Sequence, residues 1–261
     1  MRNVVFMCCI VVLAVSASSF AADQSIYAFF YSRSSGQDAE INLVNTTAET
    51  SEYVVRAYDA WGALLWEKAA SLAPYDAAFY VLGEVIPEGD SNWGVVVVIS
   101  QQALVIAGEY SIQGLLHSID VISQPLAIPE AATGYINSVY HTEASDGATS
   151  LFVLNPWSQE IAGRLTVYKS DGTPAFSTEV ILAAHESNSY NLAQLVGQDT
   201  RSWGLAEVTT SGGSVVIACK YFRSGILRVE NNAQNRPIAV TGSEATSATP
   251  ADPSTPTGKE D

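Results

Sequence analysis

Short stretches of near-alternating apolar and polar residues, divided by turn-forming residues, run along most of this chain. Residues 40–45 and 150–155 are two such stretches, each ending on an asparagine, and residues 53–58 and 164–168 follow them with a similar pattern. Successive side chains of a strand point to opposite faces, so this alternation predicts strands with one buried face. The chain is therefore expected to be all-β.

The pattern repeats itself 110 positions later. An ungapped comparison of residues 26–100 with residues 136–210 gives twelve identities in 75 positions, where chance would give about four or five. Such self-similarity indicates two copies of one domain. In each copy, residues 82–86 or 192–196 are expected to form one short helical turn. The identical pairs include Asn45 with Asn155, Tyr58 with Tyr168, Gly62 with Gly172, and Trp93 with Trp203.

Turn signals set the expected connections. Asp171-Gly172, between two apolar stretches, is a hairpin signal. The loop after residue 99 gains one residue in the second copy, which a hairpin tolerates, so residues 94–99 and 104–110 are predicted to pair. Counting gives seven or eight strands per copy. The predicted fold class is two tandem antiparallel β-sandwich domains, with a flattened barrel as the alternative.

The ends of the chain differ from the repeats. Residues 1–21 read as a signal peptide, with Arg2, an apolar run and a small-residue site at Ser19-Phe20-Ala21; an uncleaved anchor is the alternative. The expected domains are residues 22–124 and 131–239, joined by a proline-containing linker at 125–130. Residues 240–261, rich in Ser, Thr and Pro, are expected to be a disordered tail. The predicted location is periplasmic or extracellular, without a membrane span in the mature chain.

Charge and cysteine content bear on the possible partners and on disulfide formation. The chain has 12 basic and 27 acidic residues, and the expected signal peptide holds only Arg2, so the mature chain has 11 against 27, a net charge of −16. That argues against nucleic acid and anionic membranes as partners. Cys219 is the one cysteine left, so no internal disulfide forms, and its apolar surroundings predict a buried thiol.

Residues 149–156, 165–172 and 181–185, followed by Trp203-Gly204 and residues 214–218, form a line of strand, turn and strand signals. This line resembles the sensory rhodopsin transducer family and the wider set of exported β-sandwich repeats. The resemblance covers about 90 residues in each copy. It implies a compact antiparallel sandwich that works by binding, often as an oligomer. The transducers act in the cytoplasm beside a photoreceptor, so their partner is not carried over, and no functional residues transfer.

The titratable residues form no motif for catalysis or metal binding. His117, His141 and His185 are scattered, and His141 and His185 stand where the first copy has Tyr31 and Tyr75. An imidazole that replaces a phenol indicates a half-buried position and not a metal ligand. No nucleophile elbow or repeated carboxylate pair is present. We therefore predict a protein that is not an enzyme and needs no cofactor or metal.

The tryptophans are the candidate binding residues. Trp93 and Trp203 are shared between the copies, and they are predicted to be core residues. Trp61 and Trp157 are not shared, and both fall in expected turns or loops. Exposed loop tryptophans stack on sugar rings or anchor protein partners, so these two are the predicted ligand-binding residues.

The sequence leaves two classes of function. The first is an exported, non-catalytic binding or structural protein that uses loops or sheet edges to hold a protein or glycan, and that is compatible with oligomerisation. The alternative is an exported hydrolase with its site in the cleft between the two copies. Shared residues read as those that make the fold, so function is expected where the copies differ.

Overall fold

The computed structural model describes residues 24–33, 37–86, 93–112, 115–122, 126, 133–142, 147–197, 202–211, 213–223 and 226–233. Within them, each copy contains the same series of eight strands and one short helix. In the first copy these are β1 (Ser25–Ser32), β2 (Gln37–Asn45), β3 (Ser51–Asp59), β4 (Leu64–Leu72), β5 (Ala77–Val81), α1 (Leu82–Val85), β6 (Trp93–Ser100), β7 (Leu104–Ile112) and β8 (Leu115–Ile122). In the second copy they are β9 (Thr133–Thr142), β10 (Gly147–Leu154), β11 (Ile161–Lys169), β12 (Pro174–Leu182), β13 (Ser187–Asn191), α2 (Leu192–Val196), β14 (Ser202–Ser211), β15 (Val216–Arg223) and β16 (Ile226–Ala233).

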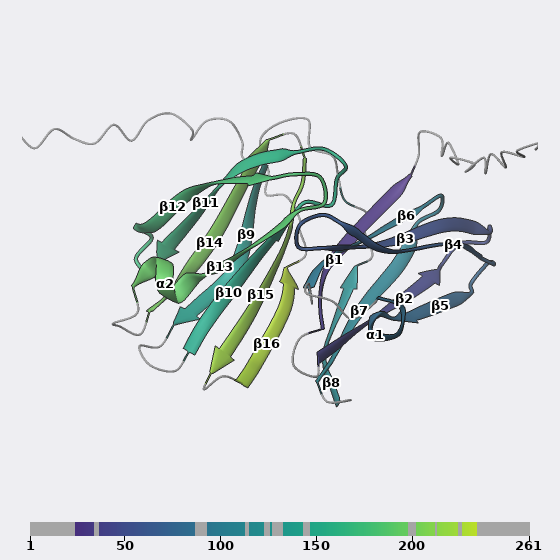
Figure 1. Ribbon diagram of the computed structural model, residues 1–261, viewed down its shortest axis with the longest axis horizontal. Coiled ribbons are helices and arrows are strands. Elements are labelled where there is room, and N and C mark those ends of the chain that lie inside the picture. Colours follow the sequence, from purple (N-terminus) through teal and green to yellow (C-terminus); the bar gives the residue numbers. More distant parts are fainter. Residues whose placement is uncertain are drawn as a thin grey trace, which may run out of the picture.

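Each copy is a sandwich of two four-stranded antiparallel sheets, and the two sandwiches lie side by side (Figure 1). The strand orders are β1-β6-β3-β4 and β5-β2-β7-β8 in the first copy. They are β12-β11-β14-β9 and β13-β10-β15-β16 in the second. The two sheets of each copy stay separate over the described residues. The prediction of tandem all-β sandwiches is therefore confirmed in its sandwich form, and each short helix forms where it was expected.

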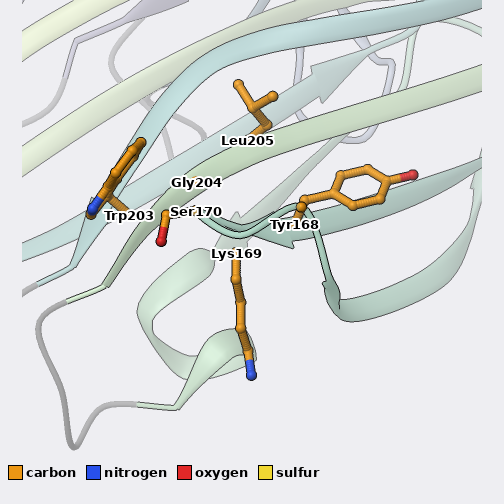
Figure 2. Close-up of a pocket in the computed structure, with 7 residues that line it drawn as sticks. Tyr168, Lys169, Ser170, Trp203, Gly204 and Leu205 are labelled. Carbon is orange, nitrogen blue, oxygen red and sulfur yellow. The ribbon is translucent and has the colours of Figure 1, made fainter.

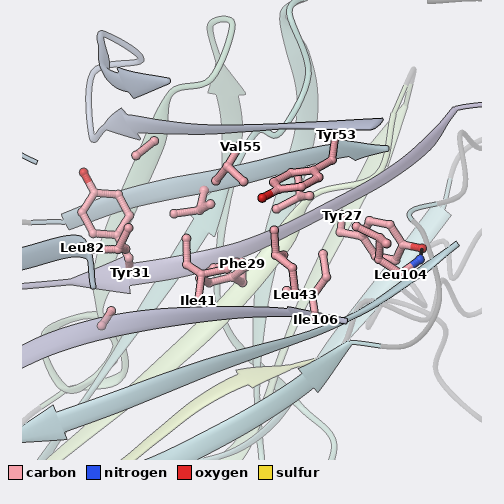
Figure 3. Packing of buried hydrophobic residues seen from close by; sticks show 14 of the residues in the cluster. Tyr27, Phe29, Tyr31, Ile41, Leu43, Tyr53, Val55, Leu82, Leu104 and Ile106 are labelled. Carbon is pink, nitrogen blue, oxygen red and sulfur yellow. Dashed lines mark hydrogen bonds between the residues drawn. The ribbon is translucent and has the colours of Figure 1, made fainter. Parts of the chain in front are cut away.

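The core of each sandwich lies between its two sheets. In the first copy, alternate residues of β1 (Tyr27, Phe29 and Tyr31) point inward and meet Ile41 and Leu43 of β2 from the opposite sheet (Figure 3). All five are fully buried. Burial of such a side chain contributes about 1.5–3 kcal/mol, which explains how an apolar core holds a sandwich that has no disulfide.

An asparagine fixes the same turn in both copies. The Asn45 amide donates to the Glu49, Leu72 and Ala73 carbonyls, at 2.7, 3.2 and 3.0 Å. Asn155 makes the same three bonds at positions shifted by 110, at 2.7, 3.2 and 2.8 Å. Its Oδ1 also accepts the backbone N–H of Trp157. The shared asparagine thus ties the end of one strand to the end of another, which confirms the structural role predicted for it.

The turns at the two shared glycines are hairpins, as predicted. Gly62 and Gly172 both have φ of +83°, a conformation that glycine adopts without steric cost. They connect β3 to β4 and β11 to β12, which pair antiparallel. Asp59 Oδ1 stabilises the first turn by accepting the N–H groups of Trp61 and Ala63.

The predicted pairing of residues 94–99 with 104–110 is wrong. β6 pairs with β1 and β3, whereas β7 pairs with β2 and β8 in the opposite sheet. The connection therefore crosses from one sheet to the other, and β14 and β15 repeat this arrangement. Two hydrogen bonds hold the crossing, one from Leu104 N–H to the hydroxyl of Tyr27 on β1 and one within the connection from the Ser100 hydroxyl to the Gln102 carbonyl. A short loop between two apolar strands fits either a hairpin within one sheet or a crossing between the two sheets. The crossing is favoured because it buries the inward face of both strands.

The expected signal peptide (1–21) and tail (240–261) lie outside the described residues, as does the linker 125–130 apart from Leu126. Leu126 donates its N–H to the Ile26 carbonyl at 2.6 Å, which ties it to the first strand. None of the helices in the described part of the chain has the length and apolar character to span a membrane.

Candidate functional site

The two sandwiches meet through one outer sheet face of each. The first copy contributes side chains of β1, β3 and β6, and the second contributes side chains of β10 and β15. Together these form an apolar cluster separate from both sandwich cores. Its fully or nearly fully buried members are Ala28, Phe30, Tyr58, Val95 and Val97 of the first copy and Phe152, Leu154, Val216 and Ala218 of the second.

Aromatic rings occupy the centre of this contact. The Phe152 ring lies 4.5 Å from the Phe30 ring and 5.2 Å from the Trp93 ring, measured between centroids. The buried Lys220 ammonium lies 5.0 Å from the Phe30 centroid and donates to Gln37 Oε1 at 2.9 Å. Aromatic pairs and a desolvated cation over a ring each add stabilisation beyond simple burial. The two sandwiches are therefore held together by a packed contact.

A turn of the second copy extends the contact. His185 has a φ of +60°, and its ring stacks on the Tyr58 ring with centroids 3.8 Å apart. Burial lowers the pKa of His185, and the nearby Arg56 lowers it further. The imidazole is thus held neutral in the contact, which agrees with the half-buried position predicted for it.

Backbone groups also join the two turns. Ser187 donates its N–H to the Ala60 carbonyl at 2.9 Å. A Cβ on Gly62 would lie 2.4 Å from the Ala184 carbonyl oxygen, so only glycine permits this approach. At the matching Gly172, a Cβ would meet nothing within 4 Å. The same turn is therefore covered in the first copy and open in the second.

The matching face of the second sandwich is uncovered at the start of β14. On β6, Val95 and Val97 of the outer face are buried because the second copy covers them. On β14, the outer-face residues Trp203 and Leu205 are 54% and 41% exposed. The inner positions of both strands are buried alike. The inner positions of the two strands thus match, and their outer faces differ in what covers them.

A hollow of about 430 Å³ lies on this uncovered surface (Figure 2). Figure 2 shows the Trp203 ring, the Leu205 side chain and the Tyr168 ring standing out from neighbouring strands around the hollow. We call this surface the open face and define it by the residues that line the hollow. These are Tyr168, Lys169, Ser170, Gly172, Trp203, Gly204 and Leu205.

Charge at the open face is confined to its rim. The Tyr168 hydroxyl donates to Glu207 Oε2 at 3.1 Å, and burial, followed by this carboxylate, raises the pKa of the phenol. Asp171, in the turn beside the hollow, has a lowered pKa because Thr173 donates two hydrogen bonds to it. The centre is left to apolar and aromatic atoms. Among the residues that the structure describes, no carboxylate, imidazole or thiol lines the hollow, so its chemistry suits binding of an apolar or ring-shaped surface.

The two predicted ligand-binding tryptophans lie elsewhere. Trp61 is 68% exposed, as expected for its turn, and its backbone forms a bridge with Glu186 at the junction of the two sandwiches. Trp157 is only 9% exposed, and the prediction that it is an exposed loop residue is wrong. Its ring packs in the core of the second sandwich, and its Nε1–H donates to the Ser214 carbonyl at 2.7 Å. A buried indole with a satisfied N–H is a structural residue.

Trp203 was missed as a site residue. Its match to Trp93 predicted a shared core position, but Trp203 lies on the outer face, and Trp93 is partly buried only because the second copy covers it. A signal was present in the sequence. β6 carries four consecutive valines, typical of a strand buried on both faces, whereas β14 returns to alternation with Glu207 and Thr209.

The remaining candidate residues have structural surroundings. Cys219 is buried, and burial raises the pKa of its thiol to about 12. The side chains of His117 and His141 lie outside the described residues. Among the side chains that are described, no group of three or more His, Cys, Asp or Glu is arranged to hold a metal ion.

Comparisons with known proteins add little to this picture. No family model and no curated protein matches the chain. Solved structures with some likeness include a β-glycosidase from Bacteroides vulgatus, at 13% identity and a TM-score of 0.18, covering 80% of this chain and 25% of that one. A second is β-glucuronidase 2 of Bacteroides uniformis, at 12% identity and a TM-score of 0.19, covering 82% and 26%. The chain spans about a quarter of their length, and TM-scores this low carry no argument about activity.

Proposed function

We propose that this is an exported, non-catalytic binding protein that holds its partner on the open face of the second sandwich. The observation that carries the proposal is the exposure of Trp203 and Leu205 around an apolar hollow, at positions whose counterparts in the first copy are covered. An exposed tryptophan beside an exposed leucine in an apolar hollow is typical of a binding surface.

The proposal places binding on a sheet face, whereas the sequence suggested loops or sheet edges. Three features support this placement. The hollow is built on two paired strands, so its side chains are held by the sheet. Its lining offers a broad apolar surface with one ammonium, from Lys169, at the rim. It also lies where the two copies differ in exposure, which is where function was expected.

The test is a binding screen with the full chain. Probes are a panel of immobilised soluble polysaccharides and an immobilised second copy of the protein. Trp203→Ser should weaken binding by about 30-fold or more, the effect of losing a central tryptophan. Ile181→Ser is the matched control, because Ile181 is 56% exposed on the same sheet and does not line the hollow.

Two results would overturn the proposal. One is the absence of binding to every probe, and the other is equal binding by the wild type and both variants. Turnover of chromogenic glycosides or esters by the purified chain would replace it with the hydrolase alternative.

A further inference from the structure

The first sandwich also has an uncovered outer face. The outer face of β10 and β15 in the second copy is buried against the first copy, whereas the matching face of β2 and β7 in the first copy is not. We call this matching surface the donor face. It consists of Val44, Val105 and Ala107, with Phe79 on the neighbouring strand β5 and Tyr75 in the adjacent turn. Each type of face is thus covered once and open once along the chain.

We propose that the partner held on the open face is a second copy of this chain, which docks through the donor face of its first sandwich. This inference rests on the proposed function and names its partner. The contact between the two sandwiches within one chain provides the template, because a second molecule placed in the same way would repeat it. Such a head-to-tail contact uses two different surfaces, so it does not close on itself and leads to open chains.

The donor face has the apolar side chains that the template uses. Val44, Val105 and Ala107 occupy the positions that Leu154, Val216 and Ala218 have in the contact within the chain. Two of these three pairs are identical residues, and the third exchanges leucine for valine. The apolar part of the surface that fits against Val95 in the first copy is therefore nearly reproduced for Leu205 in the second. Lys220 has Glu109 as its counterpart, and this carboxylate accepts a hydrogen bond from the Asn42 amide at 2.8 Å.

Phe152, at the centre of the template, is replaced by Asn42. An aromatic ring is nevertheless available beside it, because Phe79 lies directly opposite Asn42 on the paired strand β5 and points to the same face. Phe79 is 69% exposed. The donor face therefore offers an aromatic ring one strand away from where the template has one.

The turn at Tyr75 supplies the most specific correspondence. Tyr75 stands at the position of His185, and the two have nearly the same φ, +59° and +60°. Both turns are closed by a hydrogen bond from residue i+3 to the carbonyl of residue i, at 3.1 Å. His185 uses this backbone shape to stack on Tyr58. Tyr75 keeps the same shape and is 72% exposed, and Tyr168 on the open face is the counterpart of Tyr58.

An aromatic residue with positive φ is strained by about 1–3 kcal/mol, so its presence calls for a compensating contact. His185 has that contact within the chain. Docking of a second molecule would give Tyr75 the same kind of contact, ring on ring with Tyr168 of its neighbour.

Charge opposes the contact and gives it a salt dependence. Within the chain, the backbones of Trp61 and Glu186 form an isolated β-bridge. The counterparts of these two residues are Asp171 and Asp76. Docking would bring these two carboxylates together, and the lowered pKa of Asp171 keeps it ionised. Salt screens exposed like charges, so association is expected to strengthen with ionic strength. Asp171→Asn should tighten it by up to about five-fold.

The test is sedimentation velocity of the full chain over a range of concentrations, at low and high salt. The wild type should form species larger than a dimer. Trp203→Ser disables the open face, and Tyr75→Gly disables the donor face while suiting the positive φ of the turn. Each variant alone should be monomeric, with association weakened by about 30-fold. An equimolar mixture of the two should form a 1:1 complex and nothing larger, because one intact face of each kind remains.

Three outcomes would overturn the inference. The wild type could stay monomeric at every concentration and salt level. Tyr75→Gly could assemble as the wild type does, which would indicate a symmetric contact between two open faces. The mixture could fail to form the 1:1 complex. If the wild type is monomeric but binds a polysaccharide through Trp203, this inference fails and the proposed function stands; if no probe binds through Trp203, both fail.

Discussion

Phe152→Ala tests whether the two sandwiches unfold as one unit. The Phe152 side chain is 9% exposed and lies in the contact between the copies, against the Phe30 and Trp93 rings. Truncation of a buried phenylalanine costs about 3–5 kcal/mol. Of this, each lost aromatic pair accounts for about 0.5–1.5 kcal/mol.

The loss should fall on the coupling between the sandwiches and leave both sandwich cores intact. Guanidinium unfolding, followed by tryptophan fluorescence and far-UV circular dichroism, should therefore change from one transition to two that separate. Ile181→Ala is the control, because Ile181 is 56% exposed and lies outside the contact between the copies, so its loss should change stability by no more than about 0.5 kcal/mol. A Phe152→Ala variant that loses less than about 1 kcal/mol and still unfolds in one step would show that this contact does not couple the copies. The template for the head-to-tail contact would then be lost.

Three further predictions concern buried polar groups. Asn155→Ala and Asn45→Ala should each cost about 2–4 kcal/mol in urea unfolding, because several backbone groups lose a partner at once, and a cost below about 1 kcal/mol would argue against the shared role. The lowered pKa of His185 means that the unfolded chain binds its proton first, so the stability present above about pH 6.5 should fall as the pH drops below that value. A His185→Gln variant should lack that part of the pH dependence, and an unchanged profile would exclude His185 as its source. Cys219 should resist iodoacetamide at pH 8 in the folded protein and react after unfolding, as mapped by mass spectrometry, since its pKa is raised to about 12; rapid labelling of the folded state would contradict its burial.

Much of the local structure could be predicted because its causes are local. The asparagine at the end of each strand bonds within its own turn and to one neighbouring strand end. The glycines at positions 62 and 172 serve the backbone of their own hairpins. Because the sequence repeats after 110 residues, each local prediction for one copy also applied to the matching residues of the other copy.

The site could not be predicted as easily, because exposure depends on partners distant in sequence. Trp93 and Trp203 are each followed by a glycine at the start of a strand, and the packing of one sandwich on the other makes their exposure different. Trp157 looked like a loop residue because Asn155-Pro156 precedes it, yet its ring turns into the core toward Ser214. Sequence spacing gives no information on which way such a side chain points. The four consecutive valines of β6 were the one sequence feature that indicated a doubly covered strand.

The two shared glycines differ in whether another part of the protein covers their turn, and this difference gives a way to measure how often the open face is occupied. Gly62 must satisfy both its positive φ and the close approach of the Ala184 carbonyl, whereas Gly172 has only its φ to satisfy. Asparagine tolerates positive φ, so in an isolated molecule Gly172→Asn should be accepted where Gly62→Asn is not. If the open face is occupied in the cell as proposed, a saturation library selected for function would reject side chains at both positions. The mutational tolerance of Gly172, relative to that of Gly62, would then report how much of the protein is assembled where it works.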